Sequence, residues 1–323
     1  MLCAVVSPQC PGSFSAQHVI ASDSLKVQSI ALGDINGDGL LDLAAASYGD
    51  NSIEWFPNEM TDVGTFGQKN IVTTGATGAQ YVVVGDIDGD HFLDLISASY
   101  LATTPIAWYR NTDGKGAFSS PNFITTDSQQ VQSIQVGDVD GDGNLDVVSA
   151  SYGDSKIAWY PNSDGKGTFG SNIVIATTAS GAQSIAVGDV NNDGFIDVVS
   201  ASRLDNKIAW FQNTDGKGNF GTENVVTTNA VGAYDVTIAD VNGDGWVDIV
   251  SASFKDNTVA WYKSLDGKGA FSTENIVSSS VPKFGRIGVY SVVAEDLDGD
   301  GFLDLATASF GDNTIAWVRY CYV

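Results

Sequence analysis

Residues 137–169 read GDVDGDGNLDVVSASYGDSKIAWYPNSDGKGTF, and this stretch decides the fold because relatives of it cover nearly the whole chain. Its acidic segment recurs six times, starting at Asp34, Asp86, Asp138, Asp189, Asp240 and Asp296. Successive starts lie 52, 52, 51, 51 and 56 residues apart. A period of about 50 residues is typical of propellers, solenoids or arrays. We therefore expect six copies of one structural unit.

Each period contains four short runs rich in β-branched and aromatic residues, separated by Gly, Asp and Asn turns. In the third copy these runs are 122–126, 132–136, 145–150 and 156–160. Four strands per repeat are typical of a propeller blade. The sequence predicts an all-β fold, a single six-bladed β-propeller over residues 1–323 with four-stranded blades. Residues 1–13 are an N-terminal extension, and the repeats begin near residues 14, 66, 118, 169, 220 and 271.

The phase of the repeats predicts how the ring closes. The chain begins with an isolated strand at Gln17–Ala21 and ends just after the strand at Thr314–Val318. The first strand is expected to complete the last blade, which leaves no open sheet edge. Cys10 and Cys321 align with two positions of the hairpin that is missing there, which predicts a disulfide and an oxidising compartment. Cys3 is an alternative partner, and three unpaired thiols are the other possibility.

The acidic segments follow the pattern D-x-[DN]-x-D-x-x-x-D, which offers oxygen side chains at positions 1, 3, 5 and 9. Hard, oxygen-preferring cations suit such a set, and Ca²⁺ is the best candidate, with up to six ions. With the position-7 carbonyl included, the predicted ligands are Asp34, Asn36, Asp38, Leu40 and Asp42; Asp86, Asp88, Asp90, Phe92 and Asp94; Asp138, Asp140, Asp142, Asn144 and Asp146; Asp189, Asn191, Asp193, Phe195 and Asp197; Asp240, Asn242, Asp244, Trp246 and Asp248; Asp296, Asp298, Asp300, Phe302 and Asp304. An EF-hand would need Glu at position 12, where the first copy has Ala45. Solvated acidic turns are the alternative.

Charge and composition exclude several classes of function. The chain has 39 acidic and 15 basic residues, a net charge of −24, and 21 of the carboxylates lie in the acidic segments. Nucleic acid is excluded as a partner because its phosphates need a basic surface. No apolar run approaches the roughly 20 residues of a membrane span. The two histidines, His18 and His91, do not recur, and no nucleophile elbow or zinc cluster occurs, so we expect no enzyme.

The acidic segments resemble the calcium loops of FG-GAP/VCBS repeats, which occur in integrin α-subunit propellers, fungal propeller lectins and bacterial surface proteins. The resemblance covers nearly the whole chain and implies calcium in the first inter-strand loop of each blade of an extracellular, secreted or cell-surface protein. Two copies depart from the pattern, because His91 and Asn192 each replace Gly, and those sites are expected to bind more weakly. Integrin-like propellers usually have seven blades, whereas this chain has six repeats.

The face opposite the acidic segments is where a partner is expected. There the loops after the second strands present Tyr48, Tyr100, Tyr152, Arg203, Phe254 and Phe310, and the inner strands begin with Gln28, Gln80, Gln132, Gln183, Tyr234 and Tyr290. Aromatic and amide side chains suit glycans or a protein partner, although packing between blades would also explain the aromatics. An insertion at 281–287 adds Lys283 and Arg286. The chain is thus predicted to be a recognition or adhesion module for glycans or a surface protein; the alternative is a self-assembling subunit of an extracellular filament or matrix.

Overall fold

The computed structural model describes residues 20–59, 65–278, 288–296, 301–309 and 314–318. Within these ranges the chain forms strands, turns and loops, and no helix long and apolar enough to cross a membrane occurs there. The strands assemble into six antiparallel sheets, five with four strands and one with three. The expectation of an all-β fold built from repeated four-stranded sheets is confirmed.

We call the sheets blades 1 to 6. Blades 1 and 2 contain β1 (Val27–Gly33), β2 (Asp42–Ser47), β3 (Ser52–Phe56) and β4 (Asn70–Thr73), then β5 (Ala79–Gly85), β6 (Asp94–Ser99), β7 (Ile106–Tyr109) and β8 (Asn122–Thr125). Blades 3 and 4 contain β9 (Val131–Gly137), β10 (Asp146–Ser151), β11 (Lys156–Tyr160) and β12 (Ile173–Ala176), then β13 (Ala182–Gly188), β14 (Asp197–Ser202), β15 (Lys207–Phe211) and β16 (Asn224–Thr227). Blades 5 and 6 contain β17 (Ala233–Ala239), β18 (Asp248–Ser253), β19 (Thr258–Tyr262) and β20 (Asn275–Ser278), then β21 (Val289–Glu295), β22 (Asp304–Ser309) and β23 (Thr314–Val318).

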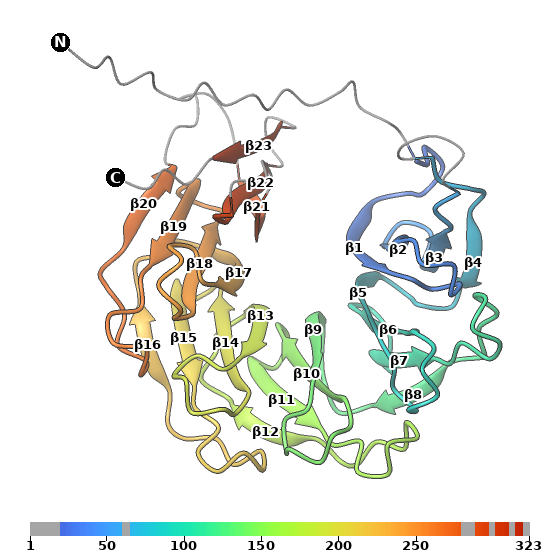
Figure 1. Cartoon of the computed structure of the whole chain (residues 1–323), viewed down its shortest axis with the longest axis horizontal. Coiled ribbons are helices and arrows are strands. Elements are labelled where there is room, and N and C mark those ends of the chain that lie inside the picture. Colours follow the sequence, from blue (N-terminus) through green and yellow to red (C-terminus); the bar gives the residue numbers. More distant parts are fainter. Residues whose placement is uncertain (1–19, 60–64, 279–287, 297–300, 310–313, 319–323) are drawn as a thin grey trace.

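The blades stand side by side around a common centre, with the first strand of each blade innermost (Figure 1). Each inner strand contacts the inner strand of the next blade, from β1 through β5, β9, β13 and β17 to β21. In Figure 1 the arc is open between blades 1 and 6. Of the closing strand predicted at 17–21, only Ile20 and Ala21 are described, and neither lies in a strand. Ring closure therefore stays a prediction, and Cys3, Cys10 and Cys321 lie outside the described residues.

Hydrophobic layers between neighbouring blades form the core. The second strand of a blade is buried along its whole length, as in β10, because adjacent blades cover both of its faces. Between blades 3 and 4 the layer joins Val148, Ile157 and Trp159 to Ile185 and Phe211. Since each layer belongs to two blades, the repeat unit cannot bury its apolar faces alone.

In blades 2 to 5 the hairpin between the third and fourth strands packs against the preceding blade. Gly218 of blade 4 has a φ of 76°, and a Cβ atom there would lie 2.1 Å from Cζ2 of Trp159 in blade 3. Trp55, Trp108 and Trp210 approach the corresponding glycines Gly116, Gly167 and Gly269 in the same way. The repeated Asp-Gly-Lys-Gly sequence is therefore needed both for backbone conformation and for close approach of the tryptophan.

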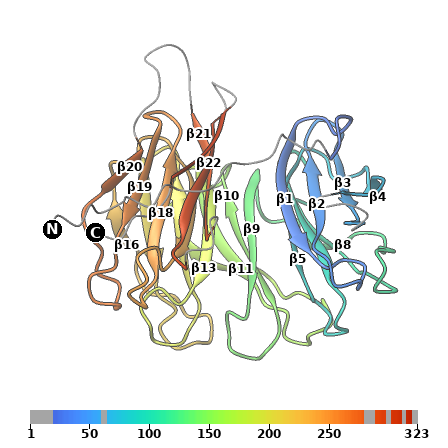
Figure 2. The ribbon, with the colours of Figure 1, turned by 45° about the horizontal axis from the view of Figure 1, so that its top comes forward.

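Connecting loops gather at the two ends of the strands (Figure 2). The loop between the first and second strands lies at the same end as the hairpin, because both follow strands running in that direction. Asn213 of the blade 4 hairpin donates its side-chain amide to the carbonyl of Val139, in the acidic loop of blade 3, at 2.8 Å. Asn111 and Asn162 make the same bond to Ile35 and Ile87. The acidic loops of blades 1, 2 and 3 are thereby each held by the next blade.

Candidate functional site

The acidic segments form loops between the first and second strands of the blades, and we number them loops 1 to 6 by blade. In loop 2 the carboxylates of Asp86, Asp88 and Asp94 each bring an oxygen within 4.8 Å of the others. Asp138, Asp140 and Asp146 do the same in loop 3. Loops 1, 4 and 5 have the same spacing with Asn at position 3. The predicted side chains at positions 1, 3 and 9 thus converge in loops 2 and 3.

The ninth position of each loop is the most buried one. Asp94 and Asp146 have no exposed surface. The carboxylate of each accepts hydrogen bonds from two backbone N–H groups. Burial raises the pKa of Asp94 to about 7 and that of Asp146 to about 6, and the nearby loop carboxylates add to this effect. A group that neutralises the carboxylates would remove this unfavourable burial of charge.

Hydrogen bonds within loops 1 to 5 fix their shape without a bound ligand. In loop 1 the carboxylate of Asp34 accepts the N–H groups of Asp38 and Gly39. The position-7 residues Leu40, Phe92, Asn144, Phe195 and Trp246 donate their N–H to the position-5 Asp at 2.9–3.1 Å. The variants His91 and Asn192 keep the left-handed backbone of the glycines they replace, with φ of 70° and 62°. The departures therefore leave the loop shape intact.

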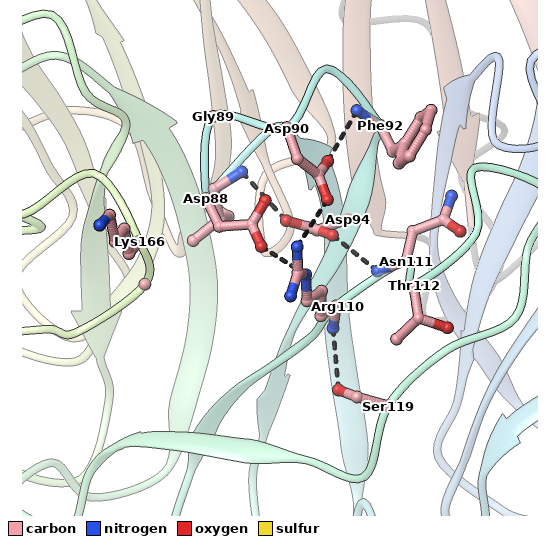
Figure 3. Close-up of polar contacts among 12 residues, drawn as sticks. Asp88, Gly89, Asp90, Phe92, Asp94, Arg110, Asn111, Thr112, Ser119 and Lys166 are labelled. Carbon is pink, nitrogen blue, oxygen red and sulfur yellow. Dashed lines mark hydrogen bonds and ion pairs between the residues drawn. The ribbon is translucent and has the colours of Figure 1, made fainter.

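Loop 2 carries a feature that the sequence reasoning missed. The Arg110 side chain points into the loop (Figure 3), where its guanidinium lies 2.5 Å from Asp88 and 2.9 Å from Asp90. Lys263 lies 3.1 Å from Asp244 in loop 5, whereas the equivalent residue is Pro in blades 1 and 3. The sequence did contain a signal for this difference. The residue directly after each third strand varies from blade to blade, while the residues around it repeat. The loops are therefore not equivalent.

The loop residues fit a calcium ion. All donors are carboxylate, amide or backbone oxygens, which Ca²⁺ prefers. Asp88 Oδ1 is buried and has no hydrogen-bond partner among the described atoms. Of loop 6, Asp296, Phe302 and Asp304 are described, and the Asp296 carboxylate accepts the N–H of Gly301. Asp298 and Asp300 lie outside the described residues.

A cavity of about 340 Å³ lies on the opposite face, where the inner strands begin. Its lining comes from blades 1 to 5: Lys26, Gln28, Tyr48, Gln80, Tyr100, Gln132, Tyr152, Gln183, Arg203 and Tyr234. All of these except Lys26 belong to the ring of side chains that the sequence placed on this face. Phe310, Lys283 and Arg286 lie outside the described residues.

Polar and aromatic groups occupy different parts of the cavity wall. The side chains of Gln132 and Gln183 hydrogen-bond to each other at 3.1 Å. Tyr234 packs against Tyr290 and Phe254 with ring centroids 4.2 and 6.0 Å apart. Tyr290 and Phe254 are not part of the lining, so for these two residues packing accounts for the aromatic side chain. Burial raises the pKa of Tyr234 above its ordinary value, which keeps its hydroxyl protonated.

Comparison with known proteins identifies solved structures of similar fold and the family of this chain. A chain of similar fold comes from a lectin of Agrocybe aegerita, described as recognising non-reducing terminal N-acetylglucosamine; the TM-score is 0.60 at 21% identity, over 85% of this chain and 73% of the lectin. A nidogen/laminin complex contains another, with a TM-score of 0.50 at 10% identity, over 74% of this chain and 76% of that one. No curated protein matches the sequence. The FG-GAP-like repeat profile matches residues 34–97, 93–149, 138–200, 189–251 and 240–307, and this chain therefore belongs to the FG-GAP-like repeat family.

Proposed function

We propose that this chain is a calcium-stabilised, six-bladed propeller that works outside the cell as a glycan-recognition module. The cavity opposite the acidic loops is the proposed binding site. The observation that carries this proposal is the convergence of amide and tyrosine side chains from five blades on a single cavity of about 340 Å³. Pockets for small ligands have volumes of about 300–1,000 Å³, so one or two sugar rings fit.

The chemistry of the lining supports a sugar ligand. Amides such as those of Gln80 and Gln132 both donate and accept hydrogen bonds, which matches sugar hydroxyl groups. Tyrosines such as Tyr100 and Tyr152 offer an apolar ring and a hydroxyl in the same side chain. The recognition of N-acetylglucosamine by the lectin of similar fold makes a glycan a reasonable class of ligand for this chain too.

The acidic loops are proposed to hold calcium through the side chains at positions 1, 3, 5 and 9 and the carbonyl at position 7. A bound divalent ion supplies positive charge to three or four carboxylates. Asn162 and Asn213 tie loops 2 and 3 to the following blade. A change in loop stability is therefore transmitted to the blade interfaces, which gives the ion a structural role.

The edge strand β23 favours a second candidate function, a subunit of an extracellular filament or matrix. Among the described strands, β23 pairs only with β22. An unpaired edge accepts a strand from the same chain or from another copy. We propose closure by the N-terminal strand, with exchange between copies as the competing arrangement. Light scattering in calcium distinguishes them, because closure gives a monomer and exchange gives concentration-dependent polymers.

A glycan array tests the main proposal. We expect saturable binding that Gln132→Ala and Tyr152→Ala each weaken by at least about tenfold, the effect of one or two lost hydrogen bonds in a site. Lys217→Ala, in the hairpin on the opposite face, is the matched control and should leave binding unchanged. Absence of saturable binding to any glycan by the calcium-loaded protein would contradict the proposal.

A further inference from the structure

Both charged residues that line the cavity are cations. Lys26 and Arg203 lie in its wall, and none of the described lining residues is acidic. This contrasts with the chain as a whole, in which acidic residues outnumber basic ones by 39 to 15. Neither Lys26 nor Arg203 forms an ion pair with any residue in the described part of the chain. Two cations without a counter-ion among the described residues therefore line the same cavity.

Lys26 departs from the repeat at a position that favours glycine. The equivalent residues in blades 2, 4 and 5 are Gly78, Gly181 and Gly232, with φ of 68°, 64° and 70°, and the equivalent in blade 3 is Gln130, with φ of 55°. Lys26 adopts the same left-handed conformation, with φ of 54°. That conformation is less favourable for a residue with a side chain than for glycine. The fold itself does not require a lysine here.

Arg203 departs from the repeat in a second, independent place. The equivalent residues are aromatic in the other described blades: Tyr48, Tyr100, Tyr152 and Phe254. The guanidinium carbon of Arg203 lies 5.4 Å from the ring centroid of Tyr234 and 5.3 Å from that of Phe254. Contact with aromatic rings fixes the orientation of a guanidinium group. The N–H groups at the edge of the guanidinium then remain available to a ligand.

We infer that the cavity selects a sugar that carries a carboxylate, such as a uronic or sialic acid residue. This inference rests on the proposed function and names the ligand class of the same site. The guanidinium of Arg203 suits a carboxylate through paired N–H groups, and the ammonium of Lys26 adds a second charge. The glutamine amides between them suit the hydroxyl groups of the ring. A sulfated sugar offers similar charge with different geometry, so it forms a separate arm of the test.

The experiment compares acidic sugars with their own methyl esters. Isothermal titration calorimetry on the calcium-loaded full chain uses the methyl glycosides of glucuronic, galacturonic and N-acetylneuraminic acid, each ester, a sulfated glucoside and acetate. Lys26→Gly and Arg203→Tyr introduce the residues of other blades, so both variants are expected to fold. Lys166→Gln, an exposed hairpin lysine on the opposite face, is the control for net charge.

The expected result is that at least one acid binds about tenfold or more tightly than its ester, the effect of one charge-assisted hydrogen bond. Lys26→Gly and Arg203→Tyr each remove most of this preference, whereas Lys166→Gln keeps it. Equal binding of acid and ester, unchanged in both variants, overturns the inference and leaves the proposed function standing. Stronger binding of the sulfated glucoside, or equal binding of acetate, also overturns it. If no sugar binds, the proposed function fails together with the inference.

Discussion

The two faces of this chain differ in how regularly equivalent residues recur from blade to blade. On the acidic-loop face, the spaced Asp and Asn positions recur in all six copies. On the cavity face, the repeat is broken at Lys26, Arg203 and Tyr234, and all three line the same cavity. Residues that every blade needs for its own stability recur, whereas a single ligand site at the centre of the arc needs different groups from each blade. On the proposed function, the difference separates structural from recognition residues.

Calcium removal is expected to give the largest effect. With a Kd of about 0.1 mM and about 1 mM calcium, each site adds roughly 1.4 kcal/mol to the free energy of unfolding. Six sites add on the order of 8 kcal/mol, comparable to the net stability of a domain. A chelator should therefore lower the melting temperature sharply, as measured by differential scanning calorimetry, and excess calcium should restore it. An unchanged melting temperature would show that calcium does not stabilise the fold.

The contact between hairpin and tryptophan is expected to give the next largest effect. Gly218→Ala places a methyl group 2.1 Å from Trp159, so we expect a loss of about 3 kcal/mol or more in unfolding free energy. Gly143→Ala is the matched control, because it has a similar φ of 89° and open space around it. That variant should lose only about 1 kcal/mol from backbone strain. Equal losses in urea unfolding at one calcium concentration would show that the tryptophan contact is unimportant.

Arg110 tests whether the acidic loops differ among themselves. Its guanidinium forms ion pairs with the carboxylates of Asp88 and Asp90. A calcium ion that binds loop 2 would therefore have to displace the arginine side chain. Arg110→Gln, which introduces the residue of blade 4, should tighten calcium binding at one site by about fivefold. Calorimetric titration of calcium measures this, with Lys255→Gln as a control of equal charge change. Weaker binding in the variant would show that the arginine assists the site.

The smallest expected effect concerns Asp235, which replaces Ser at the same position of most inner strands. It is partly buried in β17, and desolvation raises its pKa, although Ser184 and the N–H of Val292 donate to it. The folded state then holds a proton that the unfolded chain releases above its ordinary pKa of 3.8. Wild-type stability should therefore fall as pH rises through the window above that value.

Asp235→Ser introduces the repeat residue and removes this pH dependence. The unfolding free energy of the variant relative to wild type should therefore increase between pH 4 and pH 7 at constant calcium. Urea titrations at several pH values measure the difference. Parallel pH profiles for the two proteins would show that Asp235 titrates normally.

The periodic features were the most predictable from the sequence. The blades, the loop positions and most of the cavity ring follow from spacing, because each repeat places equivalent residues at equivalent points of a strand. The direction of a long side chain does not follow from spacing, so the insertion of Arg110 into loop 2 was missed. Lys26 was missed because its left-handed backbone becomes visible only by comparison with Gly78, Gly181 and Gly232. Closure of the ring depends on residues 17–19, which are not described.

The most direct test of the division between the two faces is a crystal structure of the calcium-loaded protein soaked with an acidic methyl glycoside. The account predicts ions in the acidic loops and the sugar in the cavity, with its carboxylate between Lys26 and Arg203. A sugar bound elsewhere, between blades or beside the acidic loops, with the cavity free of ligand, would contradict it.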